Sequence, residues 1–172
     1  MSIVDEIASR VQEGRLKLID VPTHRRAILV TEVVWRFLQG PWDDAEQAVA
    51  ANELRAVLHF ISSGGAIVIG SGKHRTCHLK ELTMAAPRVW EICSRAPKPG
   101  FRLFGMFADT DIFIGTNFAD RLSLGTQRSP EFKAAIRTCK ARWRSLFATY
   151  EPKTGDLHDY IKENVTDARE LH

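Results

Sequence analysis

Arginine recurs in three neighbouring apolar runs of this 172-residue chain. Arg95 follows the first run, Arg102 lies within the second, and Arg121 follows the third. An arginine guanidinium can bind a phosphate through two parallel hydrogen bonds, and it stabilises the charge that develops on a phosphodiester under attack. The three arginines therefore predict a sheet surface that binds an anionic group such as a phosphate. The alternative is that they are charges at the margin of a sheet, paired with acids such as Glu91 or Asp109.

A second group of basic residues follows directly. Residues 121–144 contain seven bases and one acid, although the net charge of the whole chain is only +3. Four of the bases recur at spacings of three and four, which places them along one side of a helix and beside its apolar face. They predict contacts with RNA phosphates, whereas the alternative is the solvated side of a helix packed on a sheet. The predicted RNA-binding residues are Arg128, Lys133, Arg137, Lys140 and Arg144.

Two other kinds of site are not supported by the spacing of the residues. A phosphate-binding loop ending at Lys73 would need glycine where Ile67 stands and serine or threonine where His74 stands. His74, Cys77 and His78 are close in sequence, but no second cluster offers the remaining zinc ligands. We therefore expect no metal and no cofactor.

The elements that must position these residues change in type along the chain. Apolar residues recur with helical period in the first third, alternate as in strands in the middle, and return to helical period after Ser129-Pro130, a strong helix start. The predicted helices cover 2–19, 24–40, 43–61, 129–150 and 156–165, and the predicted strands cover 66–70, 77–83, 89–94, 101–108 and 112–118.

This order predicts a single α+β domain over residues 1–172. N-terminal helices precede an antiparallel sheet of four to five strands, and a C-terminal helix packs on that sheet. Within the domain, 1–42 is interpreted as an N-terminal helical extension, 43–150 as the core, and 151–172 as a tail helix. No apolar run is long enough to span a membrane, the N-terminus lacks the pattern of a signal peptide, and the three cysteines suggest reduced thiols. We expect a cytoplasmic protein.

The same order of elements resembles the RelE/ParE/HigB toxin superfamily. The segment LKELTMAAPRVWEICSR is similar to the first family strand and its approach, GFRLFGMF to the second strand, IFIGTNFADR to the third, and SPEFKAAIRTCKARWRSLF to the final helix. By position, Arg102 and Arg121 match basic residues of the family motifs. Cys93 stands where the first motif ends in arginine, with Arg95 two residues later, and Asp120 replaces a lysine.

The resemblance implies a function. It implies a toxin that binds RNA and cleaves messenger RNA on the ribosome without a metal, with Arg95, Arg102 and Arg121 as catalytic residues and a cognate antitoxin as partner. A homodimer is a further expectation. The alternative is a non-catalytic interaction protein on the same fold, such as a ParE-like gyrase binder or a phage or plasmid accessory protein. His78, His158 and Tyr160 are general-base candidates by residue type alone.

Overall fold

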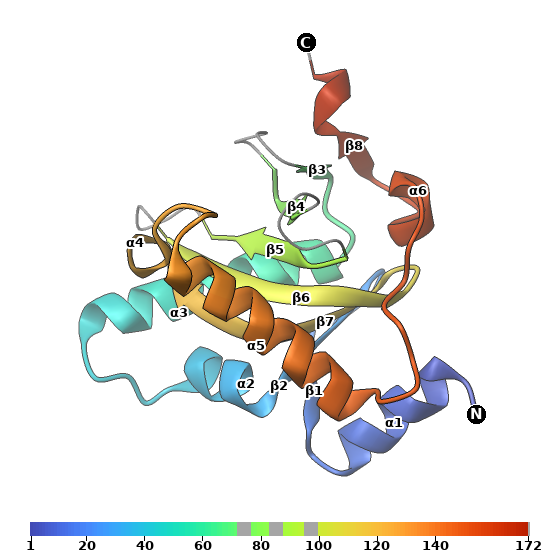
Figure 1. Ribbon diagram of the computed structural model, residues 1–172, viewed down its shortest axis with the longest axis horizontal. Helices are drawn as coiled ribbons and strands as arrows, with labels where there is room; N and C mark the ends of the chain where they lie inside the picture. The colour runs from blue at the N-terminus through green and yellow to red at the C-terminus, as the bar shows by residue number, and fades with distance from the viewer. Residues whose placement is uncertain (72–76, 83–87, 95–99, 172) are drawn as a thin grey trace.

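The computed structural model describes residues 1–71, 77–82, 88–94 and 100–171. In these ranges the chain forms a single mixed sheet with helices on both faces (Figure 1). Its strands are β1 (Leu16–Leu18), β2 (Ala27–Thr31), β3 (Ile67–Ser71), β4 (Leu79–Glu81), β5 (Trp90–Cys93), β6 (Phe101–Asp109), β7 (Ile112–Asp120) and β8 (Val165–Asp167). The helices are α1 (Ile3–Gln12), α2 (Glu32–Gln39), α3 (Ala45–Ser62), α4 (Arg121–Leu124), α5 (Pro130–Leu146), α6 (Leu157–Tyr160) and a final 3₁₀ turn (Ala168–Glu170).

The centre of the sheet is the antiparallel meander β5-β6-β7, which confirms the three strands predicted between residues 89 and 118. The rest of the sheet departs from the prediction. The described sheet has eight strands in the order β1-β2-β7-β6-β5-β4-β3-β8, and it is mixed, because β2 runs parallel to β7 and β3 runs parallel to both β4 and β8. The predicted antiparallel sheet of four to five strands is therefore too small. The broader expectation of a mixed α and β fold holds.

Three predicted helices are wrong in part. The helix predicted over 2–19 ends at Gln12, after which Gly14 takes a positive φ of 74° and the chain turns into β1. The segment 24–40 is strand first and helix second, because the β-branched run of β2 pairs with both β1 and β7 before α2 begins. The predicted tail helix is a single turn, α6, and the chain then extends into β8.

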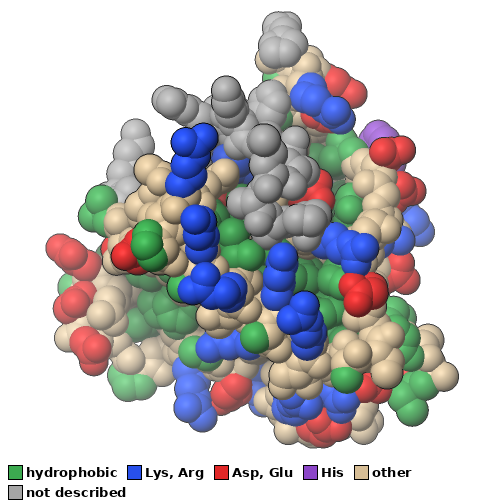
Figure 2. Space-filling model, viewed as in Figure 1, with side chains coloured by type: hydrophobic (Ala, Val, Ile, Leu, Met, Phe, Trp, Pro, Cys, Tyr) green, Lys and Arg blue, Asp and Glu red, His purple; other side chains and the backbone are tan. Residues whose placement is uncertain are grey.

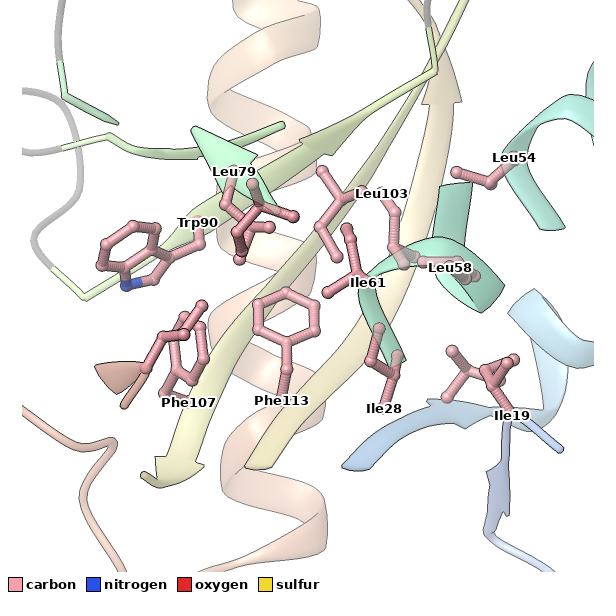
Figure 3. Packing of buried hydrophobic residues seen from close by; sticks show 14 of the residues in the cluster. Ile19, Ile28, Leu54, Leu58, Ile61, Leu79, Trp90, Leu103, Phe107 and Phe113 are labelled. Atoms are coloured by element: carbon pink, nitrogen blue, oxygen red, sulfur yellow. The ribbon is translucent and has the colours of Figure 1, made fainter. Parts of the chain in front are cut away.

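The face of the sheet that carries α2 and α3 contains the larger part of the core (Figure 3). Leu58 and Ile61 of α3 belong to the same buried cluster as Leu103, Phe107 and Phe113 of the meander. Phe107 and Phe113 meet edge to face, with ring centroids 5.2 Å apart. We call this cluster the α3-side core.

Helix α5 covers the opposite face, where it lies across β6 and β7 (Figure 1). Ser129 caps it by accepting a hydrogen bond from the Phe132 backbone N–H, as the Ser-Pro start predicts. The apolar stripe of α5 packs on Phe104 of β6, and Trp143 and the following Phe147 are 3% and 1% exposed. Both aromatic side chains belong to the buried cluster that contains Phe104 and Met106 of β6. We call this cluster the α5-side core.

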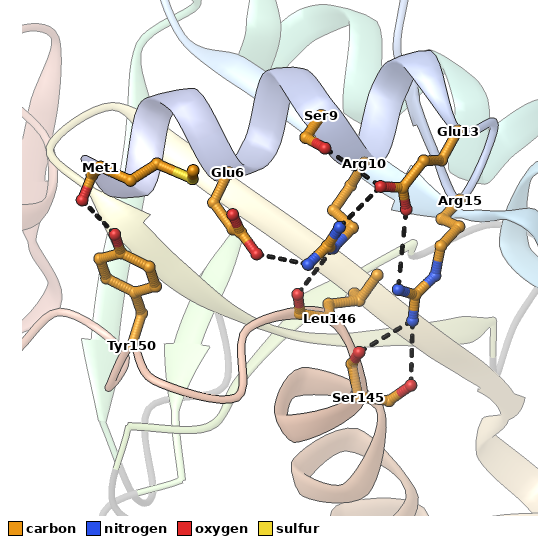
Figure 4. A network of polar contacts seen from close by, with 9 residues as sticks. All are labelled: Met1, Glu6, Ser9, Arg10, Glu13, Arg15, Ser145, Leu146 and Tyr150. Atoms are coloured by element: carbon orange, nitrogen blue, oxygen red, sulfur yellow. Dashed lines mark hydrogen bonds and ion pairs between the residues drawn. The ribbon is translucent and has the colours of Figure 1, made fainter.

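The N-terminal helix fastens the end of α5 (Figure 4). The Arg10 Nε donates to the Leu146 carbonyl at 2.9 Å, and Arg15 donates to the carbonyl and hydroxyl of Ser145 at 2.8 and 3.0 Å. Glu6 and Glu13 hold the Arg10 guanidinium from α1 and its C-cap. Because the last carbonyls of a helix lack partners within it and carry partial negative charge, the two arginines satisfy and stabilise the C-terminus of α5. The basic helix is therefore anchored at both ends.

Candidate nucleic-acid interface

The face of the sheet that carries α5 presents one row of side chains across four strands. Lys80 of β4 is paired with Glu91 of β5, Glu91 with Phe104 of β6, and Phe104 with Asn117 of β7. Phe104 continues under α5, where its ring meets Phe132 edge to face. The charged end of this row, at Lys80 and Glu91, lies on β4 and β5, whereas α5 packs mainly on β6 and β7.

Arg102 lies in the next row and approaches Glu91 diagonally. Its Nε is 3.9 Å from the Glu91 Oε1, and its Nη1 donates to the carbonyls of Ser94 at 3.3 Å and Phe101 at 3.2 Å. The side chain is 17% exposed. The guanidinium is thus oriented by two carbonyl acceptors and by the Glu91 charge, and it retains a small solvent-accessible part.

Glu91 is the buried acid of the cluster, and residue types alone did not single it out as a site residue. Its side chain is only 7% exposed, and among the described residues its Oε2 has no hydrogen-bond partner. Burial raises the pKa of the Glu91 carboxyl, and the positive charges of Arg102, Lys80 and Arg121 oppose that rise. Arg102 contacts this carboxylate, Lys80 is its cross-strand neighbour, and the charge of Arg121 acts on it from the start of α4.

Arg121 begins α4 directly after β7. Its backbone N–H donates to the Gly100 carbonyl at 3.0 Å, and its guanidinium donates to the Gly125 carbonyl. Gly100 has a φ of 77°, and a Cβ at this position would lie 2.2 Å from the Ser94 carbonyl oxygen, so this corner requires glycine. Of the three predicted catalytic arginines, Arg102 therefore lies beside Glu91, and Arg121 donates to the loop that follows α4. Arg95 lies outside the described residues.

The basic residues of α5 form the second part of the interface. Lys133, Arg137 and Arg144 are exposed and Lys140 is half-buried, while Arg128 is exposed just before the helix. None of these five side chains forms an ion pair in the part of the chain that the structure describes. Figure 2 shows Lys and Arg side chains in a band down this face of the molecule, over α5.

One base of the same segment has a structural role. The Arg142 guanidinium donates to the Thr116 carbonyl of β7 at 2.8 Å, and Asn117 Nδ2 donates to the Ala135 carbonyl at 3.1 Å. These two bonds tie α5 to β7. The charge available to a ligand is therefore smaller than the count over 121–144 suggests.

The general-base candidates named by type are held by other parts of the fold. Tyr160 belongs to the α3-side core, where it contacts Trp90 and Phe107. His158 is on the same short helix, α6. His78 accepts a hydrogen bond from the Val68 N–H at Nδ1, 2.9 Å away, and stacks on an aromatic ring of α3. Glu91 is the acid that the structure places beside Arg102 instead.

The described residues contain no group of three or more histidine, cysteine, aspartate or glutamate side chains arranged to hold a metal ion. His74, one of the residues considered as a ligand, lies outside them. Burial, followed by the nearby Glu91 charge, raises the pKa of the Cys93 thiol to about 12, so this cysteine is a thiol at neutral pH. None of the helices in the described ranges is long and apolar enough to cross a membrane.

Comparison with known proteins adds no relative. No protein-family model matches the chain, and neither the curated proteins nor the solved structures contain a match. The similarity to RelE-like toxins therefore stays a prediction based on the order of elements and the motif residues.

Proposed function

We propose that the protein binds RNA across α5 and the neighbouring end of the sheet, and that it cleaves RNA there in the manner of the RelE-like toxins that its sequence resembles. One observation carries the proposal: Arg102 lies beside Glu91, and Lys80 is the cross-strand neighbour of Glu91, on the face of the sheet that α5 also covers, and α5 presents its unpaired bases there. The cations near Glu91 and the exposed cations of α5 suit an RNA strand whose phosphates pass over both groups.

The chemistry would use the RNA's own 2′-hydroxyl. Its oxygen attacks the adjacent phosphorus, the bond to the 5′-oxygen of the next nucleotide breaks, and the 2′-hydroxyl proton leaves while the departing oxygen gains one. Arg102 and Arg121 would stabilise the negative charge on the non-bridging oxygens. Glu91 is too deeply buried to contact the ribose directly, so we assign it the positioning of Arg102. The ribosome and a cognate antitoxin are the partners that this proposal implies.

The geometry of Arg102 also supports the non-catalytic alternative. Its guanidinium already donates to two carbonyls and is only 17% exposed, so part of its hydrogen-bonding capacity is used within the fold. A protein that binds RNA, gyrase or another partner on this face without cleaving anything would need no more. The experiment must therefore separate binding from cleavage.

Arg102→Ala is the test of cleavage, and Arg36→Ala is the matched control. Arg36 lies on α2, on the other face of the sheet, and is 78% exposed. We expect the wild-type protein to slow bacterial growth and to cleave RNA, with Arg102→Ala reducing the cleavage rate by about 10²–10³ and Arg36→Ala leaving it unchanged. Absence of cleavage by the wild type, with RNA binding intact, would favour the binding protein.

Salt dependence tests the role of α5. If Lys133 and Arg137 each contact one phosphate of single-stranded RNA, removing both should reduce the slope of log K against log salt by about 1.4, or about 0.7 for each contact. Lys133→Ala/Arg137→Ala is compared with Arg36→Ala, which removes a charge from the other face. Equal slopes for the wild type and both variants would mean that the bases of α5 are only the solvated side of the helix.

A further inference from the structure

A cavity of about 320 Å³ lies against the C-terminal half of α5, separate from Arg102 and Glu91. Lys140 and Arg144 line one side, one helical turn apart, and Arg88 and the segment after α5 line the rest. Residues of α5, β6 and two connecting segments thus meet around one space. A volume of about 300 Å³ is at the lower end of the range for small-molecule sites, so the cavity suits one small ligand.

The charge of the cavity is positive. Lys140, Arg144 and Arg88 contribute three cations, and Glu151 is the acid that lines it. Glu151 is paired with Arg88 at 2.7 Å, whereas Lys140 and Arg144 form no ion pair within the described ranges. The two cations of α5 are therefore free to meet an anionic group.

Buried apolar side chains form the floor of the cavity. Met106, Trp143 and Phe147 line it and are each at most 3% exposed. The Trp143 Nε1 donates to the Tyr150 carbonyl at 2.8 Å, which fixes the backbone where the half-buried Tyr150 ring borders the cavity. An aromatic and apolar surface beside two cations suits a planar base joined to a phosphate.

We infer that this cavity binds one nucleotide, with the phosphate on Lys140 and Arg144 and the base against Tyr150 and the apolar floor. The inference rests on the proposed function and deepens it, because it adds a pocket that accommodates one nucleotide of the bound RNA strand. Lys133 and Arg137 lie one to two turns nearer the start of α5 and do not line the cavity. They contact only the backbone of the strand.

The test measures the binding of adenosine 5′-monophosphate to the full chain by isothermal titration calorimetry. Lys140→Ala/Arg144→Ala should weaken its binding about tenfold or more, because two charge-assisted contacts are lost. Lys133→Ala/Arg137→Ala removes the same charge from the same helix, and binding should stay within about twofold of wild type. Adenosine, which lacks the phosphate, should bind more weakly than the monophosphate, and a short RNA should compete with the monophosphate.

Each other outcome overturns the inference in a different way. Equal weakening by both double variants would mean a general charge effect and no pocket. RNA binding without any monophosphate binding would refute the pocket and leave the proposed function intact. Monophosphate binding that RNA does not compete for would refute the assignment to an RNA nucleotide and point to a free nucleotide. Thermal unfolding of both variants checks that they fold, and Tyr150→Ala, which should weaken the monophosphate and adenosine alike, tests the base contact independently.

Discussion

The substitution Glu91→Gln should make the protein more stable than the wild type at neutral pH, and the gain should disappear in acid. Glutamine keeps the shape of the side chain and removes its charge. At 3.9 Å from the Arg102 Nε, the charge of Glu91 is attracted by about 4 kcal/mol at an effective dielectric constant of about 20. Burial nevertheless raises the pKa of this carboxyl, so the cost of desolvation exceeds the attraction of Arg102, Lys80 and Arg121 together.

The sign of the pH dependence follows from proton binding. Because the pKa is higher in the folded state, the folded protein binds more protons than the unfolded chain between the two pKa values, and the free energy of unfolding falls as the pH rises through that interval. Below the unfolded-state pKa the carboxyl is neutral in both states and contributes nothing. The penalty is complete above the folded-state pKa. It amounts to about 1.4 kcal/mol for each unit of difference, which is also the steepest slope per pH unit.

Urea unfolding of both proteins at intervals from about pH 4 to about pH 8 measures this directly. The free energy of unfolding of the variant minus that of the wild type should rise with pH and then level off. Arg102 keeps its bonds to the Ser94 and Phe101 carbonyls in the variant, so loss of the Glu91 charge does not leave it without acceptors. A difference that falls with pH would show that the cations outweigh burial, and the account of this cluster given above would be wrong.

Three further outcomes are expected. Arg10→Ala should lower the free energy of unfolding by about 1 kcal/mol, because the Leu146 carbonyl at the end of α5 loses its charged donor. If urea unfolding shows a loss no larger than that of the exposed Arg36→Ala, the prediction is contradicted. Trp90→Phe should lower the free energy of unfolding by only about 1 kcal/mol, less than is usual for shrinking a core aromatic residue, because the Trp90 Nε1 is buried without a partner among the described residues. A loss above about 3 kcal/mol in urea unfolding would indicate that Nε1 has an acceptor after all. With the other two cysteines changed to serine, the Cys93 thiol should react with a disulfide reagent far more slowly than free cysteine. The reason is that a thiol pKa of about 12, against an ordinary value of 9.0, lowers the thiolate fraction about 1,000-fold. A rate equal to that of free cysteine in a thiol-release assay would refute this.

The parts of the fold that could be predicted are those whose signals are local. The three strands of the meander show alternation within their own residues, and α5 begins at the capping sequence Ser129-Pro130. Strand β2 was taken for helix because its run Ala27–Thr31 continues into the helical stripe of α2. Its pairing with β1, and with β7 some eighty residues later, makes it a strand. The three residues of β8 depend in the same way on β3, almost a hundred residues earlier.

The candidate site divides along the same line. Arg102 could be placed on one face of its strand from alternation, and that face is the one that carries α5. Its proximity to Lys80 and Glu91 depends on the register between β4, β5 and β6, and the pattern of residues does not predict that register. The inward turn of Arg142 toward the Thr116 carbonyl was equally hidden, because helical spacing gives the side of a residue and not the reach of its side chain.

The short outermost strands restrict how another chain could join this sheet. Both edges of the sheet as described are three-residue strands, β1 and β8, whereas the nine-residue strands β6 and β7 are internal. A strand added from outside would form few backbone hydrogen bonds, so the architecture resists edge-to-edge aggregation. It equally disfavours recognition by β-augmentation. The exposed bases of α5 offer an acidic partner a different surface, and such a partner would compete there with the RNA whose binding is proposed above.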